Sequence, residues 1–465
     1  MKRVWFGLLL LSVAAFSAIV ACTGTDPVLG DVVAPVEAGP PMVGDEGGSA
    51  EAAAATPEAG VDAQAAHISI AGKLITNNRA IPEYGLFVPL AGPGVSVYIG
   101  GKKVPAVGAD GTFTLADVAT PYDAFVIERN ASLGTYVTAY LGLTRMDPVL
   151  FGGVGQTPEF SATVTGTLTP APAGGTFALV AVGAAGGGQA TDGQSDETPT
   201  ATYSMGNVRW ASEVAPQVKA AAYTAIINGT TFLPTGFLNY GVTAPFVPVA
   251  GGANAIENIT LNQVFTTSTH VVITPPPGFA ITERVIAYQP AQGPTFRVSA
   301  TDPSATTLDF AFPSNASGEI DIRTAPANVG GFTDSVEQIL RPLVMGSQTL
   351  TVPAITSRIT APADGAITAG TPIAWSTTPN AAYRLVVYPS TGVTGGSVVL
   401  TVNTTSSGAK MPDLSKLNVV LSAGTYEAHL SALSPFGSLD DVCGPTETLG
   451  FQTNTFAVGT KFTTK

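Results

Sequence analysis

From His67 onward, apolar and polar residues alternate in short runs that are separated by turn residues. The first runs read HISIAGKLI, GVSVYIGG, TFTLADV and YDAFVIE. Alternation with a period of two is typical of strands that bury one face, and Asp110-Gly111 between two of the runs favours a hairpin turn. Only 11% of the residues are charged, whereas Gly (52) and Pro (36) are abundant. The sequence therefore predicts an all-β fold of tandem β-sandwich domains.

Changes in the pattern divide these runs into four predicted domains. They span residues 67–156, 157–265, 266–352 and 353–465. The second domain begins with EFSATVTGTLTP, a start of the same kind as the one at His67. Within the third domain, DSVEQILRP fits a short helix or a strand, because its periodicity does not separate the two.

The order of motifs in the first domain resembles the carboxypeptidase regulatory-like (transthyretin-like) domain. The resemblance rests on IAGKLI, LAGPGVSVYIGG, GADGTFTLADV and PYDAFVIE, and it covers Ile68 to Arg129. Where that family usually has Gly before the last Tyr, this chain has Thr120-Pro121 before Tyr122. The resemblance implies a β-sandwich without catalytic residues, since in metallocarboxypeptidases this domain is an appendage of the enzyme.

The last domain resembles a fibronectin type III-like or related immunoglobulin-like module. Trp375 would be the core Trp of an early strand, AYRLVVY the next strand, and GTYEAHLSAL a late strand with alternating inward residues. The Cys–Trp–Cys arrangement of true immunoglobulin domains is absent from the sequence.

The N-terminus has the parts of a secretory signal. Lys2 and Arg3 precede an apolar run that ends at Val20. A transmembrane helix needs about 20 apolar residues, so the run is marginal for that alternative. No Lys or Arg follows it before Lys73, whereas a stop-transfer anchor usually has a basic flank.

The end of this run, Ile19-Val20-Ala21-Cys22, resembles the bacterial lipobox. The resemblance implies that residues 1–21 are a lipoprotein signal peptide and that Cys22 becomes the acylated first residue. Since each buried methylene contributes roughly 0.8 kcal/mol, two or more acyl chains would hold Cys22 stably in a lipid bilayer. The alternative is an ordinary buried cysteine after a plain signal peptide. By analogy with enteric bacteria, Thr23 after the cysteine favours the outer membrane.

Residues 22–66 predict a disordered acidic tether. They are rich in Ala, Pro and Gly, and they contain eight acidic residues, no Lys or Arg and no aromatic residue. Such a segment cannot bury enough apolar surface to offset the entropy of ordering it. The formal net charge of the whole chain is −13 at pH 7. We therefore expect no nucleic-acid binding, because a protein that binds the phosphate backbone needs a basic surface.

The sequence holds no motif for a catalytic, cofactor or metal site. The three histidines, His67, His270 and His429, are far apart, whereas zinc sites need clustered ligands. We expect each to be a core or surface histidine. If Cys22 is acylated, Cys443 has no partner within the chain, and we expect it to be buried and inert rather than reactive.

For the other candidate binding residues we favour a structural role over a binding role. Asp192, Asp196 and Glu197 could supply oxygen ligands to Ca²⁺, but we expect a solvated loop. Phe232, Phe237 and Tyr240 could stack on a sugar, but we expect core residues. The N-x-S/T triplets are expected to be chance in a Thr-rich chain; they begin at Asn130, Asn228, Asn258, Asn315 and Asn403.

The predicted function is therefore that of a lipid-anchored cell-envelope protein. It would act as a non-catalytic binding, adhesion or structural display module, with an envelope protein or glycan as its partner. The alternative is a polysaccharide-binding accessory lipoprotein that serves a separate hydrolase or importer. An unrecognised hydrolase would need two carboxylates about 5–10 Å apart in a cleft.

Overall fold

The structure of the protein is a computed structural model that describes the following residues. These are residues 66–76, 90, 94–108, 110–130, 134–152, 160–173, 176–184, 190–196, 201–210, 215, 217–227, 234–251, 253–265, 267–290, 296–300, 305–312, 316–327, 333–362, 366–390, 398–444 and 452–464. Within them the regular structure is strand, apart from the 3₁₀ turn η3 (Leu414–Leu417) and the short helix α2 (Leu439–Val442). The predicted all-β fold is confirmed.

The strands form four modules in chain order. Module 1 contains β1 (His67–Thr76), β2 (Val95–Ile99), β3 (Lys102–Lys103), β4 (Thr112–Ala119), β5 (Tyr122–Asn130), β6 (Gly134–Leu143) and β7 (Val149–Gly152). Module 2 contains β8 (Phe160–Thr169), β9 (Thr176–Ala184), β10 (Ala190–Asp196), β11 (Thr202–Trp210), β12 (Val218–Ile227), β13 (Pro234–Val242), β14 (Ala253–Ile256), β15 (Ile259–Thr260) and β16 (Gln263–Val264).

Module 3 contains β17 (Thr267–Thr274), β18 (Phe279–Pro290), β19 (Phe296–Ala300), β20 (Thr307–Phe312), β21 (Ala316–Pro326), β22 (Ser335–Leu340) and β23 (Gly346–Thr351). Module 4 contains β24 (Ile359–Ala361), β25 (Ala366–Ile367), β26 (Pro372–Trp375), β27 (Ala382–Pro389), β28 (Val398–Thr404), β29 (Gly408–Lys410), β30 (Gly424–Ser434) and β31 (Thr453–Thr464).

Modules 1, 2 and 3 share one topology. Each has a three-stranded sheet with the first strand of the module in its centre: β4-β1-β7, β11-β8-β14 and β20-β17-β23. In each, the central strand pairs antiparallel with one neighbour and parallel with a late strand of the module, which is the last strand in modules 1 and 3. The other sheet has the order β3-β2-β5-β6, β10-β9-β12-β13 and β19-β18-β21-β22. The three modules are therefore structural repeats.

Two glycines occupy equivalent positions in the first strands of modules 1 and 2. Gly72 lies opposite Phe113 on β4, and Gly166 lies opposite Tyr203 on β11. A Cβ atom at Gly166 would collide with the backbone oxygen of Glu257, and one at Gly72 would lie 2.9 Å from the oxygen of Pro148. Only glycine lets the last segment of the module approach its first strand this closely.

Replacing Gly166 with Ala is therefore expected to lower the free energy of unfolding by about 1–3 kcal/mol, as overpacking does elsewhere. The matched control is Gly437→Ala, where a Cβ would meet nothing within 4 Å. Urea unfolding of both variants checks the prediction. Equal stability of the two variants would contradict the close approach at Gly166.

Module 4 is a sandwich of two sheets, β24-β26-β29 and β31-β30-β27-β28. Trp375 is 4% exposed, and its ring centroid lies 5.6 Å from that of Tyr383. This confirms the predicted core Trp. The hydroxyl of Tyr426 donates to the backbone oxygen of Ser422 at 3.1 Å, a contact of the kind found at the corner of immunoglobulin-like sandwiches.

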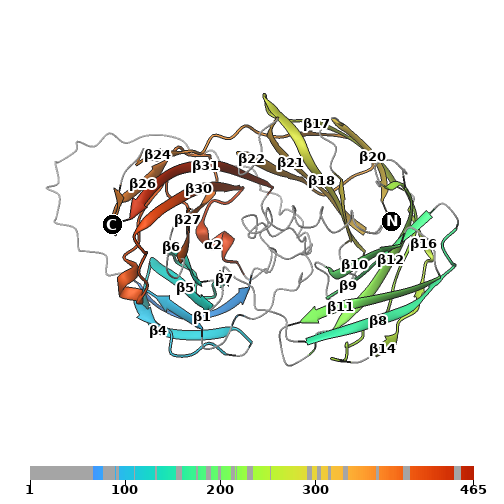
Figure 1. The fold of residues 1–465 in the computed structure, drawn as a ribbon, viewed down its shortest axis with the longest axis horizontal. Helices are drawn as coiled ribbons and strands as arrows, with labels where there is room; N and C mark the ends of the chain where they lie inside the picture. The colour runs from blue at the N-terminus through green and yellow to red at the C-terminus, as the bar shows by residue number, and fades with distance from the viewer. Residues whose placement is uncertain are drawn as a thin grey trace, which may run out of the picture.

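Both edges of the larger sheet of module 4 are occupied by strands of other modules. β28 pairs in parallel with β6 of module 1, and β31 pairs antiparallel with β22 of module 3. The result is one 13-stranded sheet that crosses three modules. Figure 1 shows the blue and red strands of modules 1 and 4 in one half of the molecule and the green and yellow strands in the other, with β31 and β22 across the top.

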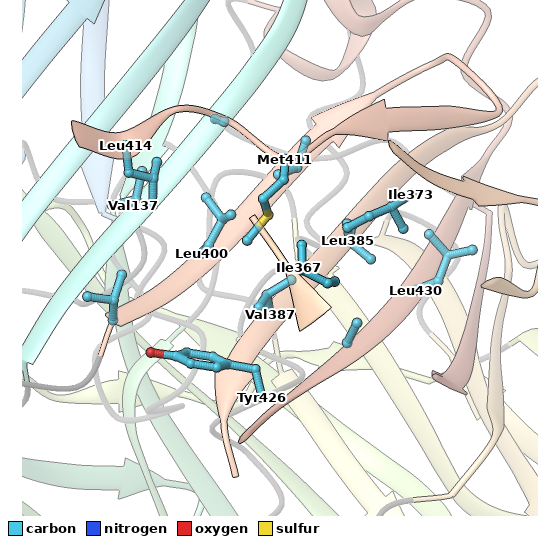
Figure 2. Packing of buried hydrophobic residues seen from close by; sticks show 14 of the residues in the cluster. Val137, Ile367, Ile373, Leu385, Val387, Leu400, Met411, Leu414, Tyr426 and Leu430 are labelled. Carbon is cyan, nitrogen blue, oxygen red and sulfur yellow. The ribbon is translucent and has the colours of Figure 1, made fainter. Parts of the chain in front are cut away.

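Buried cores are also shared between modules. Ile127, Val137 and Ala139 of module 1 pack among the core residues of module 4, and Figure 2 shows Val137 and Leu414 among the labelled members of this cluster. In module 2, one face of β12 packs in its own core and the other face packs against module 3. The run of small residues in KAAAYTAII suits a strand that is buried on both sides. The domain boundaries at residues 156, 265 and 352 stay predictions.

Polar contacts add to the contact between modules 1 and 4. The Asn403 amide donates to the oxygen of Ala139 at 3.2 Å and accepts from Arg384 Nε at 3.1 Å. The Asp440 carboxylate accepts from the backbone nitrogens of Thr144 at 3.0 Å and Arg145 at 3.2 Å. Modules that are distant in sequence thus form one packed unit.

Candidate functional site

Of the two cysteines, only Cys443 lies in the part of the chain that the structure describes. Cys22, the predicted lipidation site, lies outside the described residues. Cys443 is a free, fully buried cysteine at the C-terminal end of α2, and burial raises the pKa of its thiol well above the usual range. The prediction that Cys443 is buried is confirmed, and its raised pKa keeps the unreactive thiol form.

His67 and His270 each contact a carboxylate at the surface. His67 Nδ1 lies 2.6 Å from an oxygen of Asp117, and His270 Nδ1 lies 2.6 Å from an oxygen of Asp309. In both cases the carboxylate is on the strand that pairs antiparallel with the strand of the histidine. These two are the surface histidines expected from the sequence.

The acidic residues of the proposed Ca²⁺ loop are not in a loop throughout. The backbone of Asp192 and Asp196 belongs to β10, which pairs with β9, so the prediction of a solvated loop was wrong at these positions. Glu197 lies outside the described residues. Asp110 accepts from the backbone nitrogen of Thr112 at 3.1 Å and from its hydroxyl at 2.7 Å, and these bonds lower the pKa of Asp110. The predicted turn at Asp110-Gly111 is confirmed, but the predicted hairpin is wrong, because β4 pairs with β1 whereas β2 pairs with β3 and β5.

Of the three candidate aromatic residues, Tyr240 is 4% exposed and belongs to the core that modules 2 and 3 share. Its ring packs against Phe265 with centroids 5.5 Å apart. The core interpretation is confirmed for Tyr240. Phe232 and the side chain of Phe237 lie outside the described residues.

Three of the five Asn acceptor positions are described. Asn130 ends β5, Asn258 accepts from the hydroxyl of Thr167 at 2.7 Å, and Asn403 is buried between modules. Asn228 and Asn315 lie outside the described residues.

The described part of the chain has no group of three or more His, Cys, Asp or Glu side chains that could hold a metal ion. It also has no helix of sufficient length and hydropathy to span a membrane.

The candidate site is a polar cluster on one face of the 13-stranded sheet, formed by Tyr388 on β27 and by Glu427 and His429 on β30. His429 Nε2 lies 2.6 Å from the hydroxyl of Tyr388 and 3.0 Å from Glu427 Oε1. The His429 side chain is 0% exposed, and its ring packs edge-on against Phe456. The arrangement holds the imidazole rigidly between two strands, away from solvent.

Burial of His429 has a consequence for stability. Burial lowers its pKa below 6.5, although the hydrogen bond and charge of Glu427 act in the opposite direction. As the pH falls below 6.5, the unfolded state binds a proton before the folded state does. The free energy of unfolding is therefore expected to fall with decreasing pH, by at most about 1.4 kcal/mol per pH unit from this residue.

Urea unfolding above and below pH 6.5 checks this prediction. His429→Phe should flatten the pH dependence, because it removes the buried titrating group. His67→Asn, which changes a surface histidine, is the matched control and should keep the slope. A slope that survives in His429→Phe and disappears in His67→Asn would contradict the assignment.

Further along the same sheet, charged residues form a network. Arg323 on β21 lies 2.9 Å from Glu283 on β18 and 3.8 Å from Glu337 on β22. Burial lowers the pKa of Arg323, and the carboxylates of Glu337, Glu283 and Asp321 more than offset this, so the pKa is raised. Arg341 lies 3.5 Å from the buried Glu319. The network joins three strands through paired charges.

Sequence reasoning missed both clusters. In GEIDIRT the charged residues Glu319, Asp321 and Arg323 alternate with apolar ones, which indicates a strand with one charged face. This pattern could have predicted the charged network on β21. Tyr388 and His429 are 41 residues apart, and no local motif joins them.

Comparisons with known proteins gave no family. No family model matches the sequence, and no curated protein matches it. Among solved structures, the chain is similar to a tetra-tandem repeat in the extending region of a large adhesion protein, with 11% identity and a TM-score of 0.13, over 84% of this chain and 99% of that one.

Two further solved structures are similar to this chain at the same TM-score. The major pilin subunit of Bacillus cereus has 10% identity and a TM-score of 0.13, over 62% of this chain and 99% of that one. A pilus adhesin from Lactobacillus rhamnosus GG has 10% identity and a TM-score of 0.13, over 73% of this chain and 43% of that one.

Proposed function

We propose that the chain is a lipid-anchored cell-envelope protein that displays a rigid, non-catalytic binding or adhesion surface. The observation that carries the proposal is the 13-stranded sheet, which joins modules 1, 3 and 4 into one body. A body of this kind keeps a binding surface in a fixed geometry. The lipobox resemblance at Ile19 to Cys22 supports an anchor at the N-terminal end of that body.

Finer identities belong to the same proposal. Module 1 would be a carboxypeptidase regulatory-like domain, and the shared topology extends that assignment to modules 2 and 3. Module 4 would be a fibronectin type III-like sandwich, which the buried Trp375 and the Tyr426–Ser422 contact support. The bilayer would be the partner of acylated Cys22, and the outer membrane its location.

Mass spectrometry of the purified protein tests the anchor. We expect a mature chain that begins at Cys22 and carries acyl groups there, and a membrane fraction that retains it. Cys22→Ala should abolish acylation and release the protein from membranes. Cys443→Ala changes the other cysteine, which is buried, and should leave acylation intact. An unmodified thiol at Cys22 in the mature chain would contradict the proposal.

Affinity capture with the mature chain tests the binding function. We expect an envelope protein or glycan to be retained from solubilised envelopes and to be competed by excess free protein. A chain found free in the cytoplasm would contradict display at the cell envelope.

A further inference from the structure

The path of the chain through the structural repeats follows one pattern. In modules 1 and 3 the chain enters on the first strand and leaves on the last strand, and these two strands are parallel neighbours. In module 3, Thr269–Thr274 pair with Gly346–Thr351, and in module 1, Lys73–Thr76 pair with Val149–Gly152. In module 2 the late strands β14 and β15 are the parallel neighbours of β8, and β16 follows them and pairs with β13.

This geometry fixes how a pulling force along the chain acts on a repeat. The entry point is at the N-terminal end of one strand, and the exit point is at the C-terminal end of its parallel neighbour. The two points lie at opposite ends of the shared ladder. Tension therefore slides the strands past each other, so that all the hydrogen bonds of the ladder carry the load together. Forced unfolding is governed by the rate of this opening step.

Further bonds strengthen the same ladders. In module 3, the Thr269 hydroxyl donates to the oxygen of Gly346 at 3.1 Å, and the nitrogen of Val352 donates to the oxygen of Thr274 at 3.0 Å. In module 2, the nitrogen of Leu261 donates to the oxygen of Thr169 at 2.7 Å. The ladders are thus extended at the ends where tension would enter and leave.

We propose that these three parallel ladders are mechanical clamps, which let each repeat resist tension applied along the chain between the two parallel strands. The inference rests on the proposed function, because tension requires an anchored end. It adds a mechanical role that binding alone does not imply. The clamps themselves follow from strand pairing and are independent of acylation.

Single-molecule pulling on the full mature chain tests the clamp of module 3. Both arrangements use Ser268→Cys, an exposed position just before the ladder, and both carry Cys22→Ala, while Cys443 is buried and unreactive. The second handle is Thr351→Cys, at the far end of β23, or Met345→Cys, at the near end; both positions are exposed. The first pair loads the ladder in shear, and the second pair peels it open bond by bond.

We expect a severalfold higher rupture force for the 268–351 handles than for the 268–345 handles, because many bonds share the load in the first geometry. Equal or lower force with the 268–351 handles would overturn the proposal. The comparison uses the same fold in both arrangements, so a loss of equilibrium stability cannot produce the difference. Absence of acyl groups at Cys22 would overturn the anchor while leaving this measurement unaffected.

A second variant separates the clamp from general stability. Thr269→Val removes the hydroxyl that bonds to Gly346 in the ladder. Thr282→Val removes a hydroxyl that bonds to the oxygen of Arg323, between β18 and β21. We expect Thr269→Val to lower the shear rupture force and Thr282→Val to leave it unchanged. The same force for both variants would contradict the assignment of the load to the β17–β23 ladder.

Discussion

A chain that ends at residue 352 is expected to lose the fold of module 1 in addition to module 4. The core of module 1 includes module 4 residues, among them Leu433, Phe436 and Leu439. Removing them exposes their apolar partners to water. Each large side chain that is no longer buried lowers the free energy of unfolding by about 1.5–3 kcal/mol. It also leaves β6 and β22 as open edges, which favours aggregation.

Hydrogen exchange of β5 and β6, together with thermal unfolding, measures this loss. The matched control is a chain that begins at Ala66 and lacks the predicted tether. It keeps all the described strands, including the bond from the nitrogen of Thr120 to the oxygen of Ala66, and should unfold like the full chain. Unchanged protection of β5 and β6 in the chain that ends at residue 352 would show that module 1 folds alone.

Replacing Trp375 with Ala is expected to lower the free energy of unfolding by about 3–5 kcal/mol. Trp375 lies in the core of module 4, where its ring packs against Tyr383. Ile373 belongs to the same core cluster. Because module 4 supplies the centre of the 13-stranded sheet, the loss should lower the unfolding midpoint of modules 1 and 3 too.

Circular dichroism during urea unfolding checks this prediction without relying on tryptophan fluorescence. Trp375→Phe is the matched control. The indole nitrogen of Trp375 is buried without a hydrogen-bond partner within the described structure, so Phe loses volume but no hydrogen bond. We expect Phe to cost less than Ala. Equal cost for the two variants would contradict the packing role of the ring.

The sequence predicts the strands well because side-chain alternation is local. HISIAGKLI and AYRLVVY become β1 and β27, and the buried positions of AYRLVVY include Leu385 and Val387. For DSVEQILRP the alternatives of helix and strand stayed open, and the structure shows the strand β22. Here neighbouring strands β21 and β31 decide the outcome, and periodicity alone does not contain that information.

The pairing of modules is beyond sequence reasoning for a physical reason. Backbone hydrogen bonds join β6 to β28, and every residue type except proline offers the same donor and acceptor. Nothing in the side chains of Val398 or Thr135 therefore marks them as partners. The β10 strand was missed because Asp192, Gly193 and Asp196 have low strand preference, although β9 offers a paired edge.

The candidate clusters were missed for a related reason. His429 lies two residues from Glu427, which is visible in the sequence, but Tyr388 reaches it only through the register of β27 and β30. A polar residue in a strand gives no local sign of whether it faces water or a neighbouring side chain. The predicted anchor at Cys22 depends on residues outside the described structure and stays a prediction.

The pairing of β6 with β28 also determines the order in which parts of the protein can complete their fold during synthesis. A ribosome completes module 1 long before it reaches Val398, so the nascent protein carries an unmatched β6 border through most of translation. Contacts this remote along the polypeptide slow the acquisition of the native state. Final maturation must therefore await the carboxyl-terminal strands, and the earliest part of the protein to be made is among the last to become complete.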